Sequence, residues 1–285
     1  MNLTLSDGRM LAVHDTAPGT DAGVTVIWHH GSPQTGAALE PHLRAAAERG
    51  IRWVSYGRPE YGGSSPKLDR TIGNAAADVT ELADALGLDR FAVMGASGGG
   101  PHALACAALL PDRVWAAATF ASLAPFTSEF DWFAGMAGGG PSLRASQRGR
   151  GAREEFELTA EFDDASFNTL DYAGLANEWA SLTADVQRAS SAGPARLISD
   201  DLALVQPWRA DLSAVTVPVL LVHGGDDRVV PVSHGHRLLE LLPNSELWLR
   251  PRDGHISILD GSALAMDWLR ERAFDTGDQP KRPLT

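Results

Sequence analysis

The sequence contains one cysteine, few aromatic residues and no long apolar run. Cys106 alone cannot form an internal disulfide, and its Ala- and Leu-rich surroundings predict a small buried side chain in a reducing, cytoplasmic compartment. The strongest apolar run, Val217 to Val222, has the length of a buried strand, so we expect no membrane partner. The first residues do not combine a basic patch with an apolar stretch, so we expect no secretory signal.

Positive charge is also scarce. The 24 Lys and Arg residues stand against 36 Asp and Glu residues, which gives a formal net charge of -12. Nucleic acid and anionic membrane surfaces repel a protein of this charge, so the sequence argues against both as partners. A small-molecule substrate remains open, and the composition does not distinguish a monomer from a homodimer.

Apolar runs without polar alternation recur along the chain, separated by segments with helical spacing. Strands are expected at 24–28, 51–56, 91–94, 114–120, 217–223 and 246–249. Helices are expected at 38–49, 71–86, 101–110, 234–242 and 257–272. A hairpin over 3–15, with its turn at Asp7-Gly8, precedes them. This pattern predicts an α/β fold with a doubly wound, mostly parallel eight-stranded sheet and helices on both faces.

The alternation of strands and helices stops after residue 125. From 126 to 195 the chain is richer in glycine, acidic and aromatic residues and has no buried-strand signal. We therefore expect a core formed by 1–125 and 196–274, interrupted by a helical lid at 126–195. Residues 275–285 are polar and contain proline, which predicts a loose C-terminal tail.

One serine stands in a glycine-rich turn between an expected strand and an expected helix. The stretch Gly95-Ala96-Ser97-Gly98-Gly99 has the G-x-S-x-G pattern of a nucleophile elbow. In such a turn the residues two before and two after the serine approach closely, so both have to lack bulk. The following helix directs its N-terminus at the serine, where negative charge is favoured. The alternative is a flexible turn with an incidental serine.

A serine nucleophile requires a base and an acid that orients the base. Asp226 and Asp227 follow the strand expected at 217–223, and His255 follows the next strand. The carboxyl ends of parallel strands lie at one edge of the sheet, so these side chains and Ser97 are expected to meet there. Two adjacent residues point in different directions, so only one of the two acids can face the histidine.

Together these motifs resemble the α/β-hydrolase superfamily, in particular its lidded Ser-Asp-His hydrolases. Ser97 matches the nucleophile of that family, and His255, in Gly254-His255, matches its base. Asp227 matches its acid, because the acid typically stands four residues before a proline, here Pro231. The resemblance implies a catalytic triad of Ser97, Asp227 and His255, with no cofactor and no metal.

Two loops extend the resemblance or depart from it. His30-Gly31-Ser32-Pro33 is similar to the oxyanion loop of the family, which implies that the backbone N–H groups of Ser32 and Gly98 hold the oxyanion. The loop after the fourth strand reads Gly57-Arg58-Pro59-Glu60-Tyr61-Gly62-Gly63-Ser64, where the family often has Asp-Arg-Pro-Gly-Tyr-Gly-x-Ser. Either neighbouring residues of this surface loop compensate for the missing aspartate, or Glu60 faces the entrance of the site.

The resemblance implies hydrolysis of a small to medium carboxylic ester or lactone through an acyl-enzyme. Two other functions remain open: a proline-iminopeptidase-like aminopeptidase, and a small-molecule receptor or binding protein on a hydrolase fold. The aminopeptidase hypothesis rests on acidic lid residues that would receive a substrate ammonium, namely Glu154, Glu155, Glu157 and Glu161. The candidates for substrate contact are aromatic: Trp28, Phe126, Phe130, Trp132 and Phe133. Those in the lid have the alternative role of packing the lid on the core.

Overall fold

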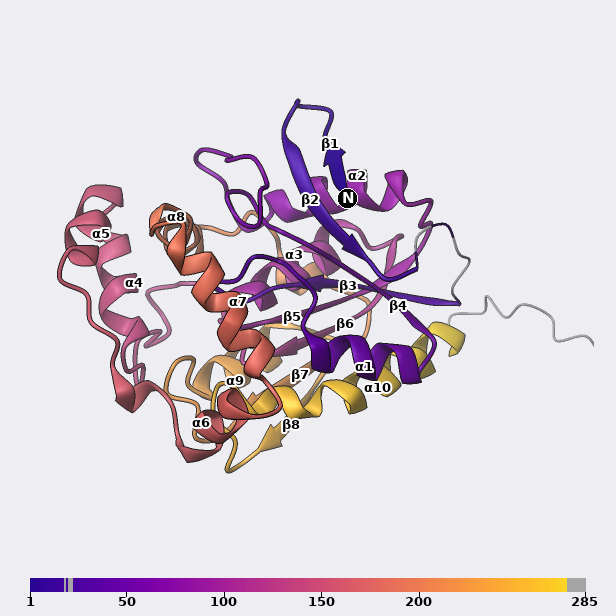
Figure 1. Cartoon of the computed structure of the whole chain (residues 1–285). Coiled ribbons are helices and arrows are strands. Elements are labelled where there is room, and N and C mark those ends of the chain that lie inside the picture. The colour runs from indigo at the N-terminus through magenta and orange to yellow at the C-terminus, as the bar shows by residue number, and fades with distance from the viewer. Residues whose placement is uncertain (18, 20–22, 276–285) are drawn as a thin grey trace, which may run out of the picture.

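The computed structural model describes residues 1–17, 19 and 23–275 of the chain (Figure 1). These residues form an eight-stranded sheet in the order β1-β2-β4-β3-β5-β6-β7-β8. Pairing is antiparallel for β1 with β2 and for β2 with β4, and parallel for the other neighbours. The strands are β1 (Asn2–Thr4), β2 (Met10–Asp15), β3 (Val24–His29), β4 (Ile51–Tyr56), β5 (Phe91–Ala96), β6 (Val114–Phe120), β7 (Val219–Gly224) and β8 (Ser245–Arg250). The predicted mostly parallel sheet is confirmed.

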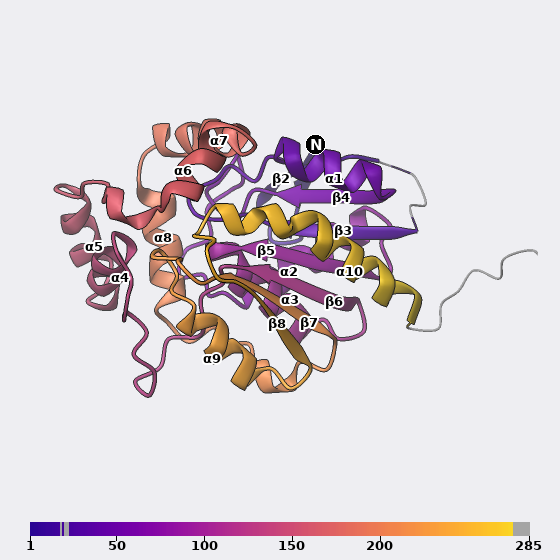
Figure 2. The same cartoon turned by 90° about the horizontal axis from the view of Figure 1, so that it is seen from below.

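Helices cover both faces of the sheet. α1 (Glu40–Glu48) packs beside α10 (Ser262–Asp275) on one face, and α2 (Asn74–Ala85) packs beside α3 (Gly100–Leu109) on the other (Figures 1 and 2). α9 (Ser233–Leu241) packs against β7 and β8. Every residue of β3 to β7 is buried, which explains why these strands lack polar alternation. No helix in the ranges described is long and apolar enough to cross a membrane.

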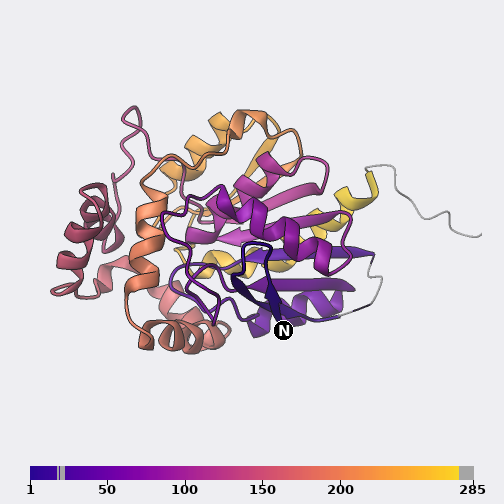
Figure 3. The ribbon, with the colours of Figure 1, turned by 90° about the horizontal axis from the view of Figure 1, so that it is seen from above.

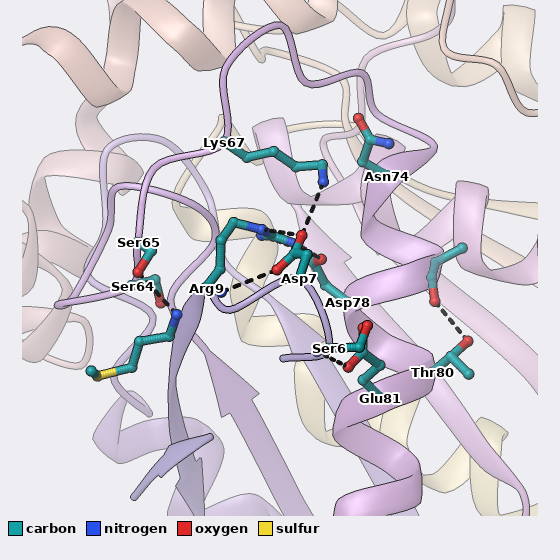
Figure 4. Close-up of polar contacts among 12 residues, drawn as sticks. Ser6, Asp7, Arg9, Ser64, Ser65, Lys67, Asn74, Asp78, Thr80 and Glu81 are labelled. Carbon is teal, nitrogen blue, oxygen red and sulfur yellow. Dashed lines mark hydrogen bonds and ion pairs between the residues drawn. The ribbon is translucent and has the colours of Figure 1, made fainter. Parts of the chain in front are cut away.

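The N-terminal hairpin is held on α2 by charged and polar side chains (Figure 4). Both terminal nitrogens of the Arg9 guanidinium donate to the carboxylate of Asp78, which is buried. The hydroxyl of Ser6 donates to Glu81 at 2.8 Å, and its backbone N–H donates to the same carboxylate at 2.6 Å. These bonds fix the edge of the sheet that lies farthest from β8.

The segment expected to form a lid is helical. It contains α4 (Gly139–Gln147), α5 (Arg150–Glu157), α6 (Thr169–Ala176) and α7 (Ala180–Ser191). The next helix, α8 (Ala195–Leu204), was predicted to belong almost entirely to the core, but it packs against α4 and α5. We therefore describe residues 126–204 together as the cap. In Figure 3 the cap lies at one end of the sheet, and the C-terminal end of α10 lies at the other.

The predicted C-terminal tail falls almost entirely outside the described residues. Asp275 is the last residue of α10, and 276–285 are not described. α10 follows a 3-10 turn at Ser257–Gly261, so the single helix expected over 257–272 is divided in two and ends slightly later.

Candidate active site

The backbone at Ser97 has the conformation of a nucleophile elbow. Ser97 directly follows β5, and its φ angle of 51° lies in the left-handed region, which L-residues rarely occupy. A Cβ atom added to Gly95 would lie 2.6 Å from the carbonyl oxygen of Gly99, and one added to Gly99 would lie 2.0 Å from that of His29. The turn therefore tolerates only glycine at these two positions. This close approach is what the G-x-S-x-G pattern predicts.

Asp227 and His255 lie together beyond the ends of β7 and β8. Nδ1 of His255 lies 2.9 Å from Oδ2 of Asp227, and both residues are buried. Oδ1 of Asp227 accepts the backbone N–H groups of Val229 and Val230, each at 2.9 Å. A carboxylate only accepts hydrogen bonds, so Nδ1 of His255 carries the proton of the neutral ring and Nε2 is left free to accept a proton.

The pKa of His255 is raised above its ordinary value of 6.5. Burial of the ring acts to lower this pKa, but the charge and hydrogen bond of Asp227 outweigh burial, and the charge of Asp171 adds to them. The imidazolium form is thus stabilised by two carboxylates, one from the loop after β7 and one from the first turn of α6. A base that has to store a proton during a reaction benefits from such stabilisation.

Asp226 points away from the histidine. Its carboxylate pairs with Arg228 at 3.0 Å and accepts Nδ2 of Asn168 at 3.1 Å. The structure therefore brings Asp227, and not Asp226, to His255. Among the described residues no hydrogen bond joins Ser97 Oγ to His255. Hydrogen bonds of this kind are often long or absent in unliganded sites and form when the substrate binds.

The loop after β3 lies against the elbow. A Cβ atom added to Gly31 would lie 3.6 Å from the Cβ of Ser97, and one added to Gly98 would lie 3.8 Å from the backbone nitrogen of Ser32. The two predicted oxyanion-hole residues, Ser32 and Gly98, are therefore neighbours beside Ser97. The parallel pairing of β3 with β5 causes this, because it ends both strands at the same edge of the sheet.

A buried ion cluster contacts the loop that carries Ser32. Asp200 of α8 accepts Arg58 at 2.7 Å and the hydroxyl of Tyr61 at 2.9 Å, and it also accepts Arg70 and the hydroxyl of Ser32. Burial raises the pKa of Asp200, but the charges of Arg58 and Arg70 outweigh burial and hold that pKa well below its ordinary value. The cluster thus joins the cap to the predicted oxyanion loop.

The loop that departs from the family pattern is anchored through this cluster. Arg58 also donates to the carbonyl oxygen of His30, and its own backbone N–H donates to the His30 ring at 3.1 Å. Glu60 is partly buried, has a positive φ of 76°, and donates its backbone N–H to Ser65 at 3.4 Å. The loop is therefore fixed by Arg58 and Tyr61 rather than by the missing aspartate.

The aromatic candidates for substrate contact fall into two groups. Trp28 is buried in the core, where its ring centroid lies 4.4 Å from that of His42, so the structure does not place it at the site. Trp132 is 1% exposed, and its Nε1 donates to the carbonyl of Ala124 at 2.7 Å. Phe133 is also buried. Phe126 and Phe130 remain partly exposed, although both rings pack on neighbouring aromatic rings.

Two cavities lie elsewhere in the part of the molecule that the structure describes, and neither is lined by Ser97 or His255. A groove of about 420 Å³ lies between α1, the start of α7 and the start of α10, with Arg44, Glu178 and Trp179 in its walls. A cavity of about 10 Å³ lies beside Arg58 and Arg70, with room for one water molecule. No group of three or more His, Cys, Asp or Glu side chains in the described part of the chain is arranged to hold a metal ion.

Comparison with known proteins identifies the family. A family model described as alpha/beta hydrolase fold matches residues 24–262. The chain belongs to this family. Within the family it is 28% identical to the non-heme chloroperoxidase of Streptomyces lividans over 256 residues, which cover 86% of this chain and 89% of that protein. It is 30% identical to the pimeloyl-[acyl-carrier protein] methyl ester esterase of Nitrosomonas europaea over 175 residues, which cover 60% of this chain and 66% of that protein.

Solved structures show the same fold. A thermophilic esterase from Thermogutta terrifontis superposes with a TM-score of 0.70 at 21% sequence identity, over 96% of this chain and 98% of that chain. The predicted alpha/beta hydrolase fold and the predicted membership of the superfamily are therefore confirmed. The sequence signals missed three side chains that hold loops of this site, namely Asp171, Asp200 and Arg70. They also missed Asp185, which attaches the cap to Thr35.

Proposed function

We propose that the protein is a serine hydrolase that cleaves a small to medium carboxylic ester or lactone through an acyl-enzyme. The observation that supports this most strongly is the hydrogen bond of 2.9 Å between His255 and Asp227, at the edge of the sheet where the strained turn holds Ser97. A base in a defined tautomer, a serine on an elbow and two neighbouring backbone N–H groups are the parts that acyl transfer requires.

In the proposed mechanism, Ser97 Oγ attacks the substrate carbonyl carbon while Nε2 of His255 takes the hydroxyl proton. The backbone N–H groups of Ser32 and Gly98 hold the negative charge that develops on the carbonyl oxygen. His255 then gives its proton to the leaving alcohol, which departs as the C–O bond breaks. Water attacks the acyl-enzyme with His255 again as base, and the acid product leaves as Ser97 regains its proton. Asp227 keeps its hydrogen bond to Nδ1 and stabilises the imidazolium.

The ester hypothesis has more support than the aminopeptidase hypothesis. The methyl ester esterase relative acts on an ester by its name. Of the acidic cap residues that would receive an ammonium, those on α5 form ion pairs or are exposed: Glu154 pairs with Arg150, and Glu157 pairs with Arg153 at 2.6 Å. Glu161 lies beyond the end of α5 and is exposed. A solvated helix face accounts for these residues. We propose no cofactor, and we retain the receptor hypothesis as an outcome of the experiment below.

The test compares three measurements on the whole chain. Hydrolysis of p-nitrophenyl acetate is measured beside that of proline p-nitroanilide, and a small fluorophosphonate is used to label the reactive serine, which mass spectrometry then locates. We expect ester turnover, labelling of Ser97, and loss of both in Ser97→Ala. Ser190→Ala, an exposed serine on α7, is the matched control and is expected to behave as wild type.

Three results would contradict the proposal. Label on another serine, with Ser97→Ala still active, would remove Ser97 from its role. Faster cleavage of the anilide than of the ester would favour the aminopeptidase. Labelling of Ser97 without turnover of any ester or lactone tested would favour a receptor that has kept its triad.

A further inference from the structure

The start of cap helix α6 contacts both loops that carry the proposed acid and base. Asn168 is the N-cap of α6, and its side chain donates to Asp226 at 3.1 Å and to the carbonyl of Arg252 at 3.3 Å. Asp171, three residues later, reaches the segment that begins at His255. Asn168 and Asp171 also bond each other in a capping box, so the two contacts form one unit.

Asp171 is fully buried and accepts four hydrogen bonds from the histidine loop. Oδ2 accepts the backbone N–H of His255 at 3.1 Å. Oδ1 accepts the backbone N–H groups of Ile256 at 2.9 Å and of Ser257 at 2.8 Å, and the hydroxyl of Ser257 at 2.8 Å. Three consecutive N–H groups thus converge on one carboxylate, which comes from 84 residues earlier in the chain than His255.

The glycine before the histidine makes room for this carboxylate. A Cβ atom added to Gly254 would lie 2.1 Å from Oδ2 of Asp171, and its three nearest neighbours would all be atoms of the Asp171 carboxyl group. Gly254 also donates its backbone N–H to Ser257 Oγ at 2.8 Å, which closes the loop. The Gly254-His255 pair is therefore shaped to accept a buried carboxylate from the cap.

We propose that Asp171 is a positioning residue, which makes the cap part of the catalytic machinery by fixing the backbone of His255. Asp227 holds the ring of the histidine and Asp171 holds its main chain. Reaction rates in enzymes are sensitive to displacements of ~1 Å at a reacting group. A site whose base is held by the cap is fully formed only while α6 is docked. This inference rests on the proposed hydrolase function.

Asp185 of α7 provides a matched control. It is also a buried cap carboxylate, and it accepts the N–H of Thr35 at 2.9 Å and its hydroxyl at 2.5 Å. It thus anchors the cap to the core as Asp171 does, but it contacts neither the loop of Asp227 nor that of His255. Asp171→Asn and Asp185→Asn therefore separate positioning of the base from simple attachment of the cap.

The first experiment measures kcat and KM for p-nitrophenyl acetate in both variants. We expect Asp171→Asn to lower kcat by ~10- to 100-fold with KM changed less than ~3-fold, because the base is displaced while the binding surface remains. We expect Asp185→Asn to leave kcat within ~3-fold of wild type. Equal losses of kcat in the two variants, or a loss confined to KM in Asp171→Asn, would show that Asp171 only attaches the cap.

The second experiment uses the pH profile of kcat/KM. The charged and titratable groups that face His255 are Asp227 and Asp171, with His223 lying 3.9 Å from Asp227. Because the charge of Asp171 helps to raise the pKa of His255, Asp171→Asn is expected to move the acidic limb to lower pH. Asp185→Asn is expected to leave that limb in place. If the acidic limb of kcat/KM lies at the same pH in Asp171→Asn as in wild type, Asp171 does not act on His255 as proposed.

A third experiment does not depend on activity. Hydrogen exchange of the amides of His255, Ile256 and Ser257 is expected to accelerate in Asp171→Asn and to stay slow in Asp185→Asn, since only the first variant replaces one of their two acceptor oxygens with an NH2 donor and removes the negative charge of the acceptor group. Slow exchange in both variants would overturn the inference even if the wild type proves to be no hydrolase.

If Asp171→Asn does not fold, Gly254→Ala displaces the same carboxylate and is expected to lower kcat while KM stays unchanged. An unchanged kcat in Gly254→Ala would overturn the inference.

Discussion

Nδ1 of His255 lies 2.9 Å from Oδ2 of Asp227, whereas the adjacent carboxylate of Asp226 pairs with Arg228 at 3.0 Å. Two consecutive aspartates thus face opposite directions. The inward one also accepts two backbone N–H groups, which fixes its orientation before any substrate binds. This difference separates the two residues in function, because only a carboxylate in contact with the histidine can select its tautomer.

Asp227→Asn is expected to lower kcat/KM for p-nitrophenyl acetate by ~10⁴-fold, because an amide that donates to Nδ1 stabilises the wrong tautomer of His255. Asp226→Asn, the matched change one residue away, is expected to remain within ~3-fold of wild type. Steady-state kinetics on both purified variants provides the measurement. If Asp226→Asn proves to be the more damaged, the orientation of this turn in solution differs from the one described.

The activity should depend on pH through His255. Its pKa lies above 6.5, and the proposed mechanism requires the neutral ring. As the pH falls through this raised pKa the base becomes protonated, so kcat/KM is expected to decline along an acidic limb whose midpoint is above 6.5. The profile is to be measured at constant ionic strength. A midpoint well below that value would mean that Asp227 does not stabilise the imidazolium as its contact suggests.

Local patterns in the sequence were sufficient to predict the strands and most helices. The buried strand β6 occupies Val114–Phe120, as predicted, because the mainly apolar run after Asp112 and Arg113 marks where the strand begins. α2 begins at Asn74 rather than at residue 71, since the side chain of Asn74 accepts the N–H of Thr71 and holds the preceding residues in a turn. A side-chain hydrogen bond of this kind, which replaces a helical backbone bond, cannot be seen in the spacing of apolar residues.

The cap carboxylates were not predictable in this way. Asp171 and Asp200 acquire their roles from partners 84 and 142 residues away, His255 and Arg58, and no local spacing relates them. Asp200 stands in α8 beside Asp201, in a helix that otherwise buries Ile198 and Leu204, so a charged pair on a largely buried helix was the only available signal. The elbow at Ser97 and the contact between Asp227 and His255 were predictable because strand ends bring these residues to one edge of the sheet.

The buried cluster around Asp200 should make stability depend on pH. The pKa of Asp200 in the folded protein is well below its ordinary value, so its contribution is present above the pKa of an unfolded aspartate and is lost as the pH falls toward the folded value. We expect the free energy of unfolding to decrease below about pH 4 in wild type, and to do so less steeply in Asp200→Asn. Urea unfolding at a series of pH values provides the measurement. If the free energy of unfolding falls equally steeply with pH in the two proteins, carboxylates other than Asp200 cause the acid sensitivity.

Removing one partner of this cluster is expected to be costly, and the costs of removing two partners are not expected to add. Arg58→Met leaves the carboxylate of Asp200 with one fewer guanidinium in a site that is 1% exposed, and we expect it to lower the free energy of unfolding by ~3–5 kcal/mol. The double variant Arg58→Met with Asp200→Asn is expected to lose less than the sum of the single losses. Additive losses would indicate that the two side chains do not interact in solution.

The aromatic residues at the start of the cap should separate into structural and substrate-contacting groups. Trp132 is 1% exposed and hydrogen-bonded to Ala124, so Trp132→Ala is expected to cost ~3–5 kcal/mol of folding free energy. Phe126 is partly exposed, so Phe126→Ala is expected to cost less and to change the ranking of p-nitrophenyl esters by acyl length. Unfolding curves and kcat/KM for acetate, butyrate and octanoate esters measure the two effects. If the ranking does not change in Phe126→Ala, this ring only packs the cap on the core, and the acyl group binds against other residues.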